Sequence, residues 1–87
     1  MVIQLGTEPD LRKRVLQRQG SLIRKTRKLR GLTIAEFAAL LSVTDGAVSQ
    51  WETGRFGPRP QMQIKIARAL DVPHSMLFGL DAESAAS

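Results

Sequence analysis

The sequence predicts a single all-helical domain. Its 87 residues are enough for one hydrophobic core, because a single domain typically contains about 100–150 residues. Hydrophobic residues make up 43% of the chain and aromatic residues only 5%, which suits a small aliphatic helical core better than a β-sandwich. Apolar residues recur at helical spacing through most of the chain. There is no cysteine, so we expect packing, and neither disulfides nor a thiolate zinc site, to stabilise the fold.

The first 20 residues are predicted to form a basic N-terminal arm or helix. Residues 1–8 show no apolar period, whereas Pro9 opens a short amphipathic helix. Gln19, Gly20 and Ser21 predict a break, with the serine as the N-cap of the next helix. The predicted division of the chain is therefore an N-terminal basic arm or helix at 1–20, a folded domain at 21–79 and a flexible tail at 80–87.

Two helices are predicted to follow this break. The first has apolar or core positions at Leu22, Ile23, Thr26 and Leu29 and ends at Gly31. The second begins with Thr33 and Glu36, which have the spacing of a capping box. Its buried residues are expected to be Phe37, Ala38 and Leu41. It ends near Ser42, where a tight turn favours a left-handed residue such as glycine.

A third helix is predicted between Thr44, its N-cap, and Thr53. Val48 and Trp51 are expected to face inward, because they lie three residues apart. The outward positions are then Asp45, Gly46, Ala47, Ser49 and Gln50.

The last two helices follow a loop at residues 55–60 that contains two prolines and a glycine. The fourth helix has apolar residues at Met62, Ile64, Ile66, Ala67 and Leu70. Pro73 opens a short fifth helix that Gly79 ends.

The chain is basic, with a formal net charge of +5 and a pI near 10.8, a balance that favours a polyanionic partner. None of the 13 lysines and arginines lies in residues 31–54, and nine gather near the N-terminus. These nine are Arg12, Lys13, Arg14, Arg18, Arg24, Lys25, Arg27, Lys28 and Arg30. The alternative is that this cluster is only a solvated helix face.

A short helix and a second helix with a polar outer face, joined by a tight turn, form the helix-turn-helix pattern. The residues that carry it here are Gly31, Leu32, Thr33, Glu36, Phe37, Ala38, Leu41, Val43, Val48, Ser49, Trp51, Glu52 and Gly54, extended by Pro58, residues 66–70 and Val72. In these residues the chain resembles the phage-repressor and Cro-like (XRE-type) helix-turn-helix family over residues 21–79. The resemblance implies a five-helix lambda-repressor-like domain, here with an extra N-terminal helix or arm.

The resemblance also implies a DNA-binding site on the third helix. The base-reading positions of the family fall on Thr44, Asp45, Gly46, Ala47 and Gln50. The amide of Gln50 matches the donor and acceptor edge of adenine. Asp45 either accepts from cytosine or only stabilises the start of its own helix. Each of these residues has the alternative of an ordinary exposed helix position.

Phosphate contacts are expected from outside the acidic central segment. The family grips the DNA backbone with the loop after the recognition helix, which implies Arg55 and Arg59 here, and with the helix start at Thr33. The glutamine that the family commonly has after this threonine is replaced by Ile34. That change shifts the expectation toward the N-terminal basic cluster, with Arg24 and Lys28 as phosphate-binding residues.

Two further expectations concern structure. The family pairs an arginine of the first helix with the glutamate after the recognition helix, which implies a structural ion pair between Arg27 and Glu52. An exposed apolar patch for a partner, or harmless exposed side chains, is expected at Ala39 and Leu40 together with Leu77 and Phe78.

The implied function is sequence-specific binding of double-stranded DNA and regulation of transcription. The family implies a repressor of phage or prophage type that binds a palindromic operator as a homodimer. The alternative is an antitoxin that also binds a toxin protein through its N-terminal segment. An enzyme is not expected, because the chain has one histidine, no cysteine and no glycine-rich phosphate loop. No cofactor, metal ion or membrane span is expected, and the predicted location is cytoplasmic.

Overall fold

The computed structural model describes residues 2–79, with side chains placed from residue 11 onward. Four helices are α1 (Val2–Leu29), α2 (Ile34–Leu41), α3 (Asp45–Glu52) and α4 (Pro60–Leu70). A fifth, short helical segment covers residues 74–79. No strand occurs within residues 2–79, so the all-helical fold class predicted from the sequence is confirmed. The predicted tail at 80–87 lies outside the described residues.

The two short helices begin and end as their capping residues dictate. Thr33 Oγ1 accepts a hydrogen bond from the Glu36 amide at 3.0 Å, and the Glu36 carboxylate accepts one from the Thr33 amide at 2.9 Å. Thr44 Oγ1 accepts from the Ala47 amide at 3.1 Å and starts α3. Ser42 ends α2 in the left-handed conformation, with φ of 59°. The turn therefore has the expected geometry although a serine stands where glycine is favoured.

The core lies between α1, α2, α3, α4 and the last helical segment. Its buried members are Ile23, Phe37, Ala38, Leu41, Val48, Ile66, Ala67, Leu70, Leu77 and Phe78. Thr26 is buried among them, and its hydroxyl donates to the Leu22 carbonyl at 2.7 Å, which satisfies this polar group within its own helix. Two of the apolar residues that the sequence places at helical spacing are exposed: Leu29 at 76% and Ile64 at 47%. Each lies on a helix side that no other element covers.

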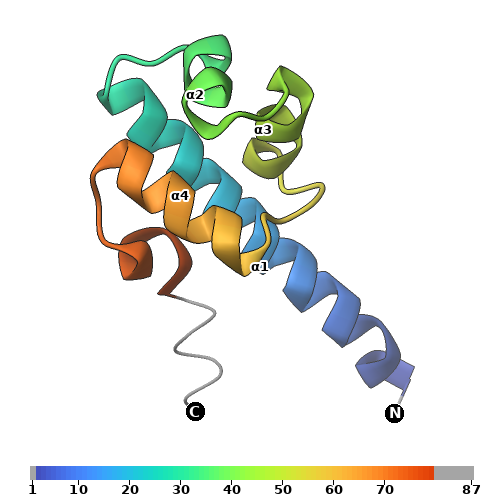
Figure 1. Ribbon diagram of the computed structural model, residues 1–87. Coiled ribbons are helices and arrows are strands. Elements are labelled where there is room, and N and C mark those ends of the chain that lie inside the picture. Colours follow the sequence, from blue (N-terminus) through green and yellow to red (C-terminus); the bar gives the residue numbers. More distant parts are fainter. Residues whose placement is uncertain (1, 80–87) are drawn as a thin grey trace.

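The predicted break at Gln19, Gly20 and Ser21 is wrong. Helix α1 runs without interruption from Val2 to Leu29, so the expected extra N-terminal helix is the first part of α1. Figure 1 shows this part extending beyond the other helices. No helix in the described part of the chain has an apolar stretch that would cross a bilayer. The division into an arm and a domain at residue 20 stays a prediction.

Gly20 is inside α1 because α3 approaches it too closely for a side chain. A Cβ atom placed on Gly20 would lie 2.2 Å from the Trp51 carbonyl oxygen and 2.6 Å from that of Glu52. The loop after α3 repeats this close approach. A Cβ on Gly54 would lie 2.6 Å from the Cα of Gln17. Helix α1 and the end of α3 are therefore in backbone contact at glycines, which fixes their crossing point.

This contact gives a prediction for stability. Alanine is a better helix former than glycine by about 1 kcal/mol, but at position 20 its Cβ would collide with backbone atoms that cannot move independently. We expect Gly20→Ala to lower the free energy of unfolding by about 1–3 kcal/mol or more, measured by thermal or urea denaturation. Gly46→Ala is the control, because a Cβ there meets only Thr44 Oγ1, at 3.9 Å. Equal or higher stability of Gly20→Ala would contradict the close packing.

Candidate nucleic-acid interface

The predicted base-reading residues lie together on the outer side of α3. Thr44, Asp45, Gly46 and Gln50 are exposed, and Ala47 is half-buried. The opposite side of the helix is buried through Val48 and Glu52. This division follows from the helical period, because buried and exposed positions alternate with a spacing of three or four residues.

The start of α3 presents free donors as well as side chains. The Asp45 and Gly46 amides stand in the first turn, where a helix offers no partner for them. Among the described residues no acceptor bonds them. A Cβ on Gly46 would meet only Thr44 Oγ1, at 3.9 Å, so another molecule can approach this backbone directly. Asp45 is the acidic residue in the first turn of α3, where a negative charge stabilises the helix start.

A buried ion pair holds α3 on α1. Arg27 Nε donates to Glu52 Oε2 at 2.6 Å, and Arg27 Nη2 donates to Glu52 Oε1 at 3.0 Å. Both side chains are at most 7% exposed. The third nitrogen, Nη1, donates to the Leu32 carbonyl at 2.8 Å, in the connection between α1 and α2. One guanidinium thus joins three segments of the chain.

The Glu52 partner keeps Arg27 in its charged form. The hydrogen bond with Glu52 raises the pKa of Arg27 above its ordinary value, while burial acts in the opposite direction and the negative charge of Glu52 raises it again. A buried charge is stable only with such a partner. Because all three guanidinium nitrogens and both carboxylate oxygens have protein partners and both side chains are buried, these two residues serve the structure.

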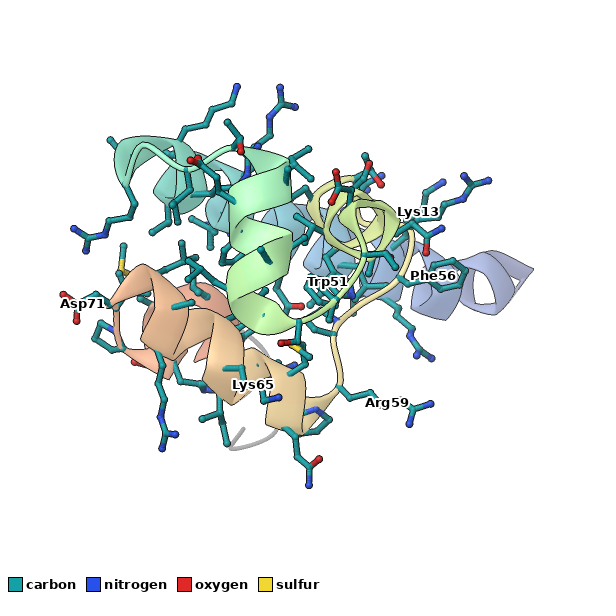
Figure 2. The ribbon with its side chains drawn as sticks, turned by 45° about the horizontal axis from the view of Figure 1, so that its top comes forward. Lys13, Trp51, Phe56, Arg59, Lys65 and Asp71 are labelled. Carbon is teal, nitrogen blue, oxygen red and sulfur yellow. The ribbon has the colours of Figure 1, made fainter. Side chains whose placement is uncertain are left out.

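Exposed cations lie on two elements next to α3: the loop that follows it and helix α1, which packs against it. Arg55 and Arg59 are exposed in the loop after α3, and Figure 2 shows Arg59 pointing away from the body of the protein. Arg59 also precedes α4 as its N-cap residue, but its side chain makes no capping hydrogen bond. Arg24 and Lys28 are exposed on α1. All four side chains are therefore free to contact a polyanion.

Thr33 is less available than the sequence predicts. Its hydroxyl and its amide are both engaged with Glu36 in the capping box. The amides of Ile34 and Ala35, in the first turn of α2, have no acceptor among the described residues. A phosphate at this helix start would therefore meet those two amides before the Thr33 amide.

The sequence did not indicate the partners of Arg30 or the exposed position of Phe56. Arg30 belongs to the basic cluster, but its Nε donates to the Leu70 carbonyl at 2.8 Å and its Nη2 donates to the Asp71 carbonyl at 3.2 Å, so it caps the end of α4. Phe56 is 58% exposed although it is apolar. It lies beside the end of α3, and its amide donates to the Gln50 carbonyl at 3.4 Å. The only sequence feature at Phe56 is an aromatic residue between two arginines in a loop.

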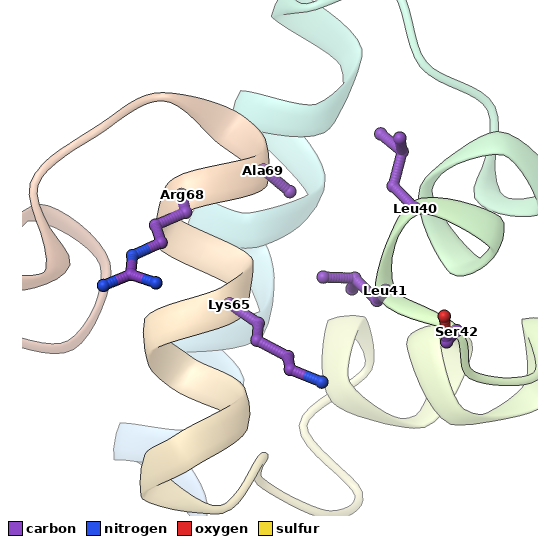
Figure 3. Close-up of a pocket in the computed structure, with 6 residues that line it drawn as sticks. All are labelled: Leu40, Leu41, Ser42, Lys65, Arg68 and Ala69. Carbon is purple, nitrogen blue, oxygen red and sulfur yellow. The ribbon is translucent and has the colours of Figure 1, made fainter.

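An open groove of about 370 Å³ separates α2 from α4 on a different part of the surface. Its lining residues are Leu40, Leu41, Ser42, Lys65, Arg68 and Ala69. Figure 3 shows Lys65 extending toward Leu41 and Ser42, whereas Arg68 points away from α2. Leu40 is 60% exposed, but Leu77 and Phe78 are each 1% exposed. The apolar patch expected from these residues together is therefore wrong, because the last two belong to the core.

This chain is similar to known proteins in both sequence and structure. Residues 23–77 match the sequence family described as Helix-turn-helix. The chain superposes on a crystal structure of the clp gene regulator ClgR from Corynebacterium glutamicum with a TM-score of 0.71 and 25% identity, over 83% of this chain and 77% of that chain. A second ClgR structure gives a TM-score of 0.70 and 24% identity, over 80% of this chain and 91% of that chain. A comparison with curated protein sequences finds no significant match.

The ion pair gives a second prediction. Replacing Arg27 by methionine leaves the Glu52 carboxylate buried without its partner, which costs about 3–5 kcal/mol for pairs of this kind. We expect the melting temperature of Arg27→Met to fall by roughly 10 °C or more, as measured by calorimetry. Arg24→Met, an exposed arginine three residues earlier, is the matched control. A midpoint for Arg27→Met equal to that of the control would exclude the structural role.

Proposed function

The chain belongs to the helix-turn-helix family of DNA-binding transcription regulators, and we propose that it is a repressor that reads its operator with α3. The observation that carries the proposal is the outer side of α3. Thr44, Asp45, Gly46 and Gln50 are exposed there, while the inner side of α3 is fixed by the core and by the Arg27–Glu52 pair. A rigid helix with a free polar side is the form of element that enters a major groove.

Base reading is assigned to the exposed positions of α3. Gln50 pairs its amide with the N7 and N6 edge of adenine, and the methyl group of Ala47 contacts a thymine methyl. Gly46 lets the helix start approach the groove closely, as its open surroundings permit. Asp45 accepts from cytosine N4 or stabilises the start of α3. Thr44 is exposed at the same end and completes the set.

Phosphate binding supplies most of the affinity in this proposal. Arg55 and Arg59 contact the backbone beside the end of α3, and Arg24 and Lys28 contact it from α1. The start of α2 at Thr33 adds neutral donors from its first turn. These contacts fix the position of the protein on the duplex, whereas α3 provides the sequence preference.

Regulation is then steric. We expect a repressor of phage or prophage type that acts in the cytoplasm and occupies a palindromic operator as a homodimer, with half-sites about 34–36 Å apart. A bound dimer blocks polymerase at an overlapping promoter. The test is selection of bound sequences from random duplex DNA by the full chain, followed by a mass measurement of the complex. An enriched palindrome bound by two protomers supports the proposal, and the absence of any enriched sequence would overturn it.

The role of Gln50 gives a third prediction. Gln50→Ala should lose about 1–3 kcal/mol of discrimination at one position of each half-site, because alanine cannot make the paired hydrogen bonds with adenine. The measurement is binding to a library in which each operator position is randomised in turn. Gln61→Ala, an exposed glutamine at the start of α4, is the control. An unchanged preference at every position would remove Gln50 from the base-reading set.

The loop arginines give a fourth prediction. The double variant Arg55→Ala, Arg59→Ala should weaken binding to all sequences alike, because phosphates carry no sequence information. The slope of log affinity against log salt should fall by about 1.8 for two lost phosphate contacts. Arg68→Ala, an exposed arginine beside the groove between α2 and α4, should keep the slope of the original chain. Losses confined to one operator sequence would contradict a phosphate role.

A further inference from the structure

The first part of α1 leaves the body of the protein beside the end of α3. A Cβ on Gly57 would lie 2.6 Å from the Leu16 side chain, and a Cβ on Gly54 would lie 2.6 Å from the Gln17 backbone. These contacts place the loop after α3 directly on α1, one turn before the crossing at Gly20. The part of α1 that precedes Leu16 therefore emerges next to the loop that carries Arg55 and Arg59.

The helical period of α1 determines which of its cations point in the same direction as Gly20, that is, toward α3. With 3.6 residues per turn, Lys13 points within about 20° of the direction of Gly20, and Arg24 within about 40°. Arg12 and Lys28 lie about 80° from that direction, one on each side of it. All four cations are exposed. Arg18 lies on the opposite side of the helix, two residues from Gly20. It is exposed as well.

In the view of Figure 2, Lys13 and Phe56 are both seen to the right of α3. Lys13 has no ion pair or hydrogen bond with any described side chain. It stands about 10 Å along the axis from Gly20, at 1.5 Å per residue. That distance equals the axial rise of about three phosphates along one strand of DNA.

The dimensions of the major groove bring a phosphate ridge to this position. The groove is about 8.5 Å deep, and a helix with its side chains is about 10–12 Å across. When α3 lies in the groove, the sugar-phosphate ridges on both sides therefore rise nearly to the level of its inner side. Helix α1 crosses α3 on that inner side, so its emerging part passes a ridge with the Lys13 side turned toward the DNA.

We propose that the first part of α1 is a second phosphate-binding element, and that Lys13 is its contact residue. Together with Arg24 and Lys28, it forms a row of cations along α1 that extends the phosphate contacts beyond the loop after α3. The glycine contacts at positions 20, 54 and 57 hold this row rigidly relative to α3. This inference rests on the proposed function, because α3 must lie in the groove for Lys13 to reach the ridge.

The test compares two single cations on the same helix. Lys13→Gln and Arg18→Gln each remove one positive charge from an exposed position of α1. Affinity for duplex DNA is measured between 50 and 200 mM salt, for both the selected operator and a non-specific duplex. For Lys13→Gln we expect the slope of log affinity against log salt to fall by about 0.9, so that its salt-induced loss is about 3.5-fold smaller. Arg18→Gln should keep the original slope.

A second measurement identifies the contact itself. Single phosphates of the operator are replaced by neutral methylphosphonates, and each duplex is bound by the original chain and by Lys13→Gln. We expect one to three neighbouring phosphates, adjacent to those that respond to Arg55→Ala, to lower the affinity of the original chain but not of Lys13→Gln. Circular dichroism with unchanged helix content shows that the variants are folded.

The outcomes separate this inference from the function on which it rests. Equal effects of Lys13→Gln and Arg18→Gln, or no phosphate coupled to Lys13, would overturn the inference while operator binding persisted. If selection enriches no sequence, the repressor proposal fails. The non-specific duplex then still measures whether Lys13 differs from Arg18, and equal slopes on it would overturn the inference as well.

Discussion

The bidentate ion pair between Arg27 and Glu52 connects the parts of the molecule on which its function depends. It joins α1 to the end of α3, and the remaining guanidinium nitrogen binds the Leu32 carbonyl before α2. The stability of this pair depends on its geometry, because a displaced partner would leave a buried charge without compensation. The orientation of α3 relative to the basic helix α1 is therefore set by one directional contact, whereas the apolar core around it is much less directional.

Close backbone approach acts together with this pair. Gly20 and Gly54 let α1 and the end of α3 meet without side chains between them. The cost of a glycine inside a helix, about 1 kcal/mol relative to alanine, is offset by contacts that no other residue permits. The result is a single long helix that both closes the core and continues beyond it, next to the loop that carries Arg55.

The chain separates structural polar groups from those that remain free. Arg27, Arg30, Glu36 and Glu52 all have protein partners. Most other cations of α1 and of the loop after α3 are exposed. The charged side chains that orient helices are thus held by partners within the protein, and Arg55 and Arg59 stay exposed beside the end of α3. Such an arrangement supports electrostatic attraction of a polyanion without loss of rigidity at the reading helix.

The sequence by itself determined the helical class, the caps at Thr33 and Thr44, the turn at Ser42 and the exposed side of α3, because these features depend on local hydrogen bonds and on helical period. It also indicated the partners Arg27 and Glu52, but through family resemblance. Tertiary structure alone decided that α1 continues through Gly20, that Arg30 caps α4 and that Leu77 and Phe78 are buried. These features depend on which segments meet in space, and a local pattern contains no information about a neighbour that is distant along the chain.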